Sequence, residues 1–429
     1  MSDDTPQMAL RTVLLTDADG LLQVVVATQD LLDLAQLEQA CERPLKALTR
    51  HGILRAHRRR ELTPVAGSRH CYALPTVIDK RLANEGHRPV EPDGKSLDEI
   101  SAALRAAGLH VQYHTCTVPA EQLCHRLPDV EQDGARIQRS IQQFTTRRIR
   151  QRLDEILEFP PLSPTAERIL QLRANPNATA DELTAIIESD PSLAAQVVSW
   201  ASSPYYAAPG RVSSVRDAIV RVLGFELVSN LAVGLILGRA VAIPTDQADG
   251  ISPYWEQAVY CSMAVETLMR MMAPAQRPRQ GMLYLSGLLH NFGYLVLAHT
   301  FPPHFSMICR YMEANPVISH VAVEHYLIGI CREQIGTWLL QAWRMPGELV
   351  AALRYQHDAE YQGEHAVYAN LLYMALRLLR EQGIGDGPYE DIPAHLFQRY
   401  GLNADECREA IIALLHSQDA AQLVEQMNS

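Results

Sequence analysis

The hydrophobic period of the chain changes near residue 130, and this change constrains the fold more than any other feature of the sequence. Before it, short segments rich in β-forming residues alternate with helical segments. After it, the segments up to residue 426 have apolar residues at the spacing of amphipathic helices. The sequence therefore predicts an α+β chain of two domains, a small α/β domain followed by an all-α domain.

The α/β domain is predicted to open with a β-hairpin. Residues 11–16 and 21–27 are rich in β-formers, and residues 17–20 are expected to form a four-residue loop between them. Asp33 is predicted to cap a helix, and residues 109–118 are a further strand candidate.

Capping residues mark several helix starts in the second part of the chain. Ser163 precedes a proline, Thr179 begins a capping box that Glu182 completes, and Asp190 precedes a second proline.

The most apolar stretch, residues 227–244, contains Ser and Asn and one Arg. We therefore expect it to be a buried core helix and expect no membrane span.

The charge is unevenly distributed. The chain has 38 Lys and Arg against 49 Asp and Glu, a net charge of −11, which argues against a general nucleic-acid-binding protein. Two stretches, residues 43–60 and 136–152, carry only basic charges. We predict that residues 131–158 form a basic connecting helix that packs between the domains, with an anionic membrane or nucleic acid as the open alternative.

The cysteines and the N-terminus indicate a cytoplasmic protein. Eight cysteines are scattered without the spacing of a disulfide framework, which is typical of reduced thiols. The N-terminal stretch is acidic and lacks the apolar segment of a signal peptide, so we expect none.

Motifs in the helical part resemble an HDOD domain. They occur in order at residues 159–163 (FPPLS), 186–194 (IIESDPSLA), 202–206 (SSPYY), 218–224 (AIVRVLG), 287–293 (GLLHNFG), 335–340 (IGTWLL) and 343–346 (WRMP). HDOD domains are all-helical bacterial modules, related to HD-superfamily phosphohydrolases and generally regarded as regulatory. The resemblance covers about residues 150–375 and implies an all-α HDOD domain over residues 159–429, including a C-terminal helical extension.

The front of the chain resembles the YbaK/prolyl-tRNA deacylase-like fold. The hairpin, the helix start at Asp33 and residues 74–79 (LPTVID) carry this resemblance, which implies a domain over residues 1–130. That family hydrolyses misacylated tRNA with a lysine in the first strand region, where Arg11 stands here. Arginine is a poor general base, so we expect no deacylation. The candidate phosphate or RNA contacts are Arg11, Arg55, Arg58, Arg59 and Arg60.

The HD resemblance implies a site at which histidines and a bridging aspartate hold metal ions. Carried over one by one, its positions fall at Gln257, His290, Asn291, Arg332, Gln356, His357 and Asn370. Only His290 and His357 keep a ligand type, and Arg332 adds positive charge where a cation would bind. We therefore interpret these residues as a vestigial pocket and expect no metal, no cofactor and no catalytic residue.

These observations favour a non-catalytic bacterial signal-transduction or scaffold protein that acts through protein partners. The alternatives are an enzyme, either an aminoacyl-tRNA deacylase or a nucleotide phosphohydrolase, and an RNA-binding adaptor that uses the basic stretches. A small-molecule or nucleotide ligand of the pocket also stays open.

Overall fold

The computed structural model describes residues 7–65, 68–83, 88–124, 127, 130–144, 162–206, 210–240, 244, 248 and 252–428. Its contacts divide the chain into two compact units. The first, the sheet unit, combines the N-terminal part of the chain up to residue 125 with Pro303–Gly329. The second, the helical unit, includes the described residues of 130–240 and 252–302 and those from Ile330 onward.

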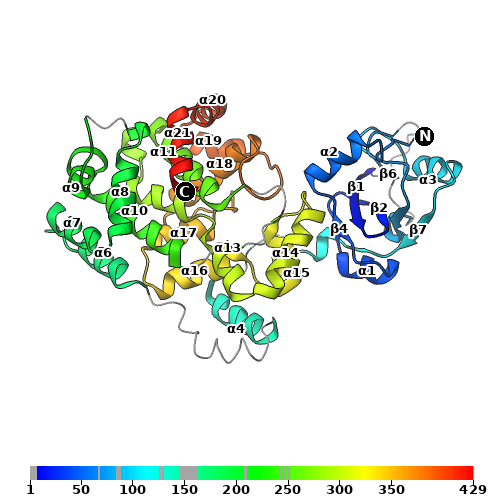
Figure 1. Ribbon diagram of the computed structural model, residues 1–429, viewed down its shortest axis with the longest axis horizontal. Helices are drawn as coiled ribbons and strands as arrows, with labels where there is room; N and C mark the ends of the chain where they lie inside the picture. Colours follow the sequence, from blue (N-terminus) through cyan, green and yellow to red (C-terminus); the bar gives the residue numbers. More distant parts are fainter. Residues whose placement is uncertain are drawn as a thin grey trace. The chain divides into compact units, whose positions relative to one another are not determined.

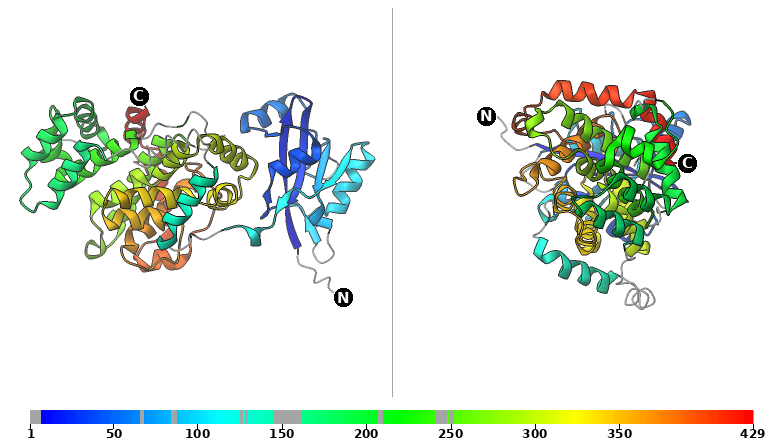
Figure 2. Two further views of the ribbon diagram at one scale, coloured as in Figure 1. Left: turned by 90° about the horizontal axis from the view of Figure 1, so that it is seen from below. Right: turned by 90° about the vertical axis from the view of Figure 1, so that its left-hand side faces the viewer.

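A mixed six-stranded sheet forms the centre of the sheet unit (Figures 1 and 2). Its strands are β1 (Gln7–Asp17), β2 (Gly20–Ala27), β4 (Lys46–Ala47), β5 (Thr76–Asp79), β6 (Arg88–Val90) and β7 (Val111–His114). The order is β4-β1-β2-β5-β7, with β6 also paired to β1. The β1–β2 pair is antiparallel, whereas β5 is parallel to both β2 and β7.

The predicted hairpin is confirmed, but its loop is shorter than expected. Asp17 pairs directly with Gly20, so the loop has two residues and not four. Gly20 has a φ of 118°, a conformation that glycine adopts readily and other residues rarely do. The tighter turn extends β2 by one residue at its start.

The helix cap at Asp33 is also confirmed. Its carboxylate accepts hydrogen bonds from the backbone N–H groups of Ala35 and Gln36 at the start of α1 (Leu34–Cys41).

The predicted strand over residues 109–118 is wrong in its extent, because it divides into β7 and β8 (Thr117–Val118). β8 pairs with β3 (Leu31–Leu32) in a separate two-stranded sheet. Between them, the Cys116 carbonyl accepts from the Asp33 N–H.

Two helices from the middle of the chain complete the core of the sheet unit. These are α14 (Pro302–Ala314) and α15 (His320–Ile328), and the unit also contains α2 (Arg50–Arg58) and α3 (Leu97–Ala106). Apolar residues of α14 and α15 share one buried cluster with residues of β1, β2, β3 and α1. Sequence periodicity predicted the two helices but not their place in this unit.

The helical unit confirms the predicted change to all-helical structure, since its described residues contain no strand (Figure 1). Its α-helices are α4 (Asp133–Phe144), α6 (Pro164–Ala174), α7 (Ala180–Glu188), α8 (Pro191–Ala201), α9 (Val215–Asp217), α10 (Gly224–Ala240), α11 (Tyr254–Met271), α12 (Gln280–Leu289), α13 (Phe292–Thr300), α16 (Arg332–Ala342), α17 (Gly347–Arg354), α18 (Ala366–Glu381), α19 (Ala394–Arg399), α20 (Ala404–Leu415) and α21 (Gln418–Asn428). The caps predicted at Ser163, Thr179 and Asp190 all form.

Two helical stretches, Val215–Arg239 and Gln280–Thr300, are long and apolar enough to cross a membrane by length and composition. The apolar windows are 56% and 100% buried inside the protein, so the window of the second stretch belongs to the core. Residues 145–161 lie outside the described part of the chain. The predicted continuation of the connecting helix and residues 159–161 of the FPPLS motif fall there, and the domain boundaries at residues 130 and 158 stay predictions.

Candidate functional site

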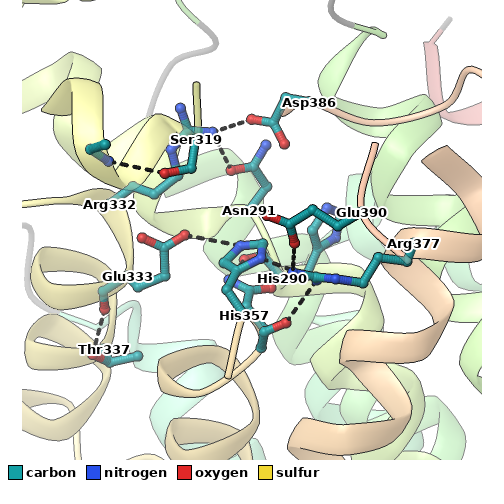
Figure 3. Close-up of polar contacts among 12 residues, drawn as sticks. His290, Asn291, Ser319, Arg332, Glu333, Thr337, His357, Arg377, Asp386 and Glu390 are labelled. Atoms are coloured by element: carbon teal, nitrogen blue, oxygen red, sulfur yellow. Dashed lines mark hydrogen bonds and ion pairs between the residues drawn. The ribbon is translucent and has the colours of Figure 1, made fainter. Parts of the chain in front are cut away.

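Five of the seven residues predicted for the pocket gather in one place in the helical unit (Figure 3). They come from the junction of α12 and α13, the start of α16 and the end of α17; they are His290, Asn291, Arg332, Gln356 and His357. Gln257 and Asn370 are buried but have other partners. The Gln257 side chain donates to the Ser252 carbonyl, and Asn370 donates to the Tyr400 hydroxyl.

Glycines bring the helices of the pocket into backbone contact. A Cβ atom on Gly293 in α13 would lie 1.9 Å from the carbonyl oxygen of Arg332 at the start of α16. A Cβ atom on Gly287 in α12 would lie 2.5 Å from the Cα atom of Ser262 in α11. Neither position can hold a side chain without a shift of backbone, so these glycines set the spacing of the pocket residues.

His290 is a buried, neutral ring. Its Nδ1 lies 2.8 Å from the Gly287 carbonyl oxygen. Because a carbonyl oxygen only accepts, Nδ1 carries the proton and Nε2 is left unprotonated. Burial lowers the pKa of His290 to about 4. The side-chain amide of Gln356 donates to the His290 carbonyl oxygen at 2.9 Å and connects the ends of α12 and α17.

Arg332 places a buried positive charge in the pocket. Its side chain is 2% exposed, and its guanidinium donates to the Asn291 side-chain oxygen at 3.1 Å. The same nitrogen forms an ion pair with the carboxylate of Asp386 (Figure 3). The guanidinium carbon also lies 4.9 Å from the centre of the Tyr294 ring, a cation–π distance.

Arg377 in α18 adds a second buried positive charge. One of its nitrogens lies 2.6 Å from the carboxylate of Glu390, and its guanidinium carbon lies 3.5 Å from the centre of the Tyr373 ring. Another nitrogen lies 3.4 Å from Nδ1 of His357 (Figure 3). A guanidinium group only donates, so Nδ1 of His357 accepts in the neutral ring and Nε2 carries the proton.

The Nε2 atom of His357 lies 3.4 Å from a carboxylate oxygen of Glu333. Glu333 is buried, and it follows Arg332 directly in the sequence. The pocket therefore holds one chain of polar contacts that runs from Glu333 through His357 to Arg377 and Glu390.

The carried-over residues do not fit the metal centre of an HD phosphohydrolase. That chemistry needs negatively charged ligands around a cation, and among the carried-over positions Arg332 forms an ion pair with Asp386 instead. In the described part of the chain, the group that could hold a metal ion is a different set, His320, Glu333 and His357, of which only His357 is a carried-over residue. Asn291, which the resemblance equates with the bridging aspartate, uses its side-chain oxygen to accept from Arg332. The space among His290, Arg332, Glu333 and Gln356 is too small to admit a water molecule.

The sequence motifs did not identify the acids of the pocket or Arg377 as site residues. Asp386 and Glu390 lie in a short connection after α18, and no family motif marks them. Three glycines at alternate positions, Gly383, Gly385 and Gly387, were the available signal, because such a run indicates a backbone with an unusual path.

The basic residues predicted in the sheet unit fall in two different environments. Arg11 in β1 donates to the backbone oxygens of Ala314 and Asp30, both at 3.0 Å, and to the Asn315 side chain at 2.7 Å. Burial lowers its pKa to about 10. The other four lie exposed on α2 or just after it; they are Arg55, Arg58, Arg59 and Arg60.

Comparison with known proteins supports the sequence motifs. The HDOD domain model matches residues 159–359. A curated but uncharacterised protein of Treponema pallidum is 23% identical over 273 residues, which cover 62% of this chain and 50% of that protein. The chain thus spans about half the length of this curated relative.

Two solved structures extend the likeness beyond the matched domain. A candidate signal transduction protein from Marinobacter aquaeolei VT8 is 41% identical, with a TM-score of 0.86 over 100% of this chain and 95% of that one. An HDOD domain protein of unknown function from Geobacter sulfurreducens is 20% identical, with a TM-score of 0.54 over 70% of this chain and 99% of that one. The motifs and the domain match agree that residues 159–359 form an HDOD domain, and the chain belongs to the same protein family as the Marinobacter protein.

Proposed function

We propose that this chain is a cytoplasmic signal-transduction or scaffold protein whose HDOD domain binds partners without catalysing a reaction. The observation that carries the proposal is the Arg332–Asp386 ion pair at a position carried over from a metal-ligand histidine. Metal-dependent hydrolysis requires a cation that lowers the pKa of a bound water. A buried guanidinium opposes that cation through electrostatic repulsion.

The whole-length similarity to a candidate signal transduction protein supports the signalling part of the proposal. We further propose that the sheet unit is a YbaK-like sensory or docking module. The β1–β2 hairpin and the Asp33-capped helix support that assignment. The partners we expect are proteins.

The test compares the wild-type chain with a variant in which ligand types are restored: Asn291→Asp, Arg332→His and Gln356→His together. Metal content is measured after dialysis against Mn²⁺ or Fe²⁺, and hydrolysis is measured with nucleotides and cyclic dinucleotides. We expect metal and turnover to be at background in the wild type, with metal retained only by the restored variant. Wild-type turnover that is lost in His290→Ala would overturn the proposal.

An RNA-binding adaptor is the second candidate, and the four exposed arginines of the α2 region favour it. Phosphate contacts from exposed arginines give salt-dependent binding that is insensitive to sequence. Filter binding with a tRNA-sized RNA tests this function. Arg58→Glu with Arg59→Glu should eliminate binding, whereas Arg168→Glu, at an exposed position in α6, should not.

A further inference from the structure

Both buried arginines of the pocket are paired with a single short segment. Residues 383–392, here named the strap, connect α18 to α19 and have neither helix nor strand. The strap supplies Asp386 to Arg332 and Glu390 to Arg377 (Figure 3). Two carboxylates from one connection thus neutralise two guanidinium groups from two helices.

Glycines determine the path of the strap. Gly383, Gly385 and Gly387 have φ values of 84°, 111° and 98°, a range that residues with a side chain rarely adopt. A Cβ atom on any of them would meet nothing within 4 Å, so backbone conformation and not space requires glycine there. The Gly385 N–H donates to the Ser252 hydroxyl at 3.3 Å, which holds this part of the strap beside the start of α11.

The acids form the outer layer of the pocket and the arginines its inner layer. The side chains of Arg332 and Arg377 are 2% and 8% exposed, whereas those of Asp386 and Glu390 are 11% and 46% exposed. A buried charge without a partner is strongly unfavourable, so these guanidinium groups require an anion. The anion can be exchanged from the solvent side if the strap moves.

We propose that the pocket is a binding site for a phosphate-bearing ligand, and that Asp386 and Glu390 stand in for the ligand's phosphate oxygens when the strap is closed. Guanidinium groups bind phosphate through paired N–H donors, as they bind carboxylate. A phosphomonoester carries a charge of about −1.5 to −2 near pH 7, enough to neutralise a guanidinium group whose strap carboxylate has been displaced. This inference rests on the proposed function, because it assigns the pocket to binding and not to hydrolysis.

The test measures the affinity of the full-length chain for inorganic phosphate by calorimetry, with NaCl used to equalise ionic strength. Asp386→Asn removes the ion pair between the strap and Arg332. We expect the Asp386→Asn variant to bind phosphate at least about tenfold more tightly than the wild type, because the strap is open in a larger fraction of the molecules. Adding Arg332→Gln to that variant should eliminate the gain.

Two further variants keep the result interpretable. Gly387→Ala strains the strap at a φ of 98° and changes no charge, so it too should tighten phosphate binding. Glu381→Gln is the matched control, since it removes the acid of the Arg408 ion pair outside the pocket and should leave phosphate affinity unchanged.

The inference is overturned if Asp386→Asn and Gly387→Ala bind phosphate no better than the wild type, or if the gain survives Arg332→Gln. Failure of the proposed function gives a different result. A wild-type chain that hydrolyses phosphate esters would contradict the non-catalytic role, while the tighter phosphate binding of the strap variants would still hold.

Discussion

A Cβ atom placed on Gly336 would lie 2.7 Å from the Cα atom of Gly293, so helices α13 and α16 touch backbone to backbone. Asn291 stands two residues before one glycine, and Arg332 stands one helical turn before the other. The hydrogen bond between these two side chains therefore depends on the glycine contact.

Replacing Gly336 with alanine should force the two helices apart. We expect Gly336→Ala to lower the free energy of unfolding by about 1–3 kcal/mol, the usual cost of adding a methyl group to a closely packed core. Urea unfolding monitored by circular dichroism measures this change. Gly134→Ala is the control, because its Cβ atom would lie 3.5 Å from the Trp338 ring nitrogen, an ordinary contact. Equal stabilities for the two variants would contradict the predicted role of the contact.

Burial of His290 should make the protein less stable in mild acid. The folded pKa is about 4 and the ordinary value is 6.5, so between these pH values the unfolded chain binds more protons. The contribution of His290 is complete above pH 6.5 and is lost as the pH falls toward 4. For this one group the loss is on the order of 3 kcal/mol.

The measurement is the free energy of unfolding at a series of pH values between 4 and 7. The slope of this free energy against pH reports how many more protons the unfolded chain binds than the folded one. His290→Gln should lower that number by up to one. His416→Gln is the matched control, since it removes an exposed histidine whose Nδ1 also bonds a backbone carbonyl. A wild-type slope that survives in His290→Gln would show that other groups cause the acid sensitivity.

The attachment of α14 to the sheet should depend on Asn315. Its side chain donates to the Leu32 carbonyl at 3.0 Å and accepts from the Leu32 N–H and from Arg11, each at 2.7 Å. Asn315→Ala removes the partner of the buried Leu32 N–H and carbonyl groups, and each buried group that loses its partner costs about 1–3 kcal/mol. We expect faster hydrogen exchange in β3 and α1, with no change in α11 or α12.

Asn175→Ala provides the control for this measurement. Asn175 is exposed, and its side chain accepts from the Asn177 N–H at 3.0 Å, so its loss should not affect the sheet unit. Uniform acceleration across both units in Asn315→Ala would mean that the chain unfolds as a whole, which would contradict local attachment.

Local structure was predictable from the sequence because nearby residues determine it. The hairpin depends on Gly20, and the start of α1 depends on Asp33 and the two N–H groups that follow it. The assignment of α14 and α15 to the sheet unit was not predictable in this way. An amphipathic pattern shows that one face of a helix is buried, but not which surface covers that face.

The pocket, too, was predictable from the sequence only in part. A family resemblance was enough to identify the positions that meet at His290, Asn291 and Arg332, because the helices of the family hold them in order. It could not identify Asp386 or Glu390, since these acids pair with arginines that the family's metal site does not contain. The pairing depends on the three-dimensional arrangement of the strap and the helices.

The described part of the connecting helix is attached to the helical unit by an acid. Asp133 begins α4, is buried, and lies 3.1 Å from the guanidinium of Arg354 in α17. The side chain of Gln334 donates to the same carboxylate at 2.7 Å. Of the six arginines in residues 136–152, Arg147, Arg148, Arg150 and Arg152 lie outside the described residues.

Breaking this pair should detach α4. Arg354→Met leaves the Asp133 carboxylate buried with its amide donor but without its cation, a change that typically costs about 3–5 kcal/mol. Adding Asp133→Leu removes the unpaired charge, so the double variant should recover part of the loss. A double-mutant cycle from urea unfolding should therefore give a coupling energy of about 0.5–3 kcal/mol.

Arg136→Ala, which removes an exposed hydrogen bond to Gln132, should cost less than about 1 kcal/mol. Additive effects of Asp133→Leu and Arg354→Met would show that the two side chains do not hold α4 as a pair.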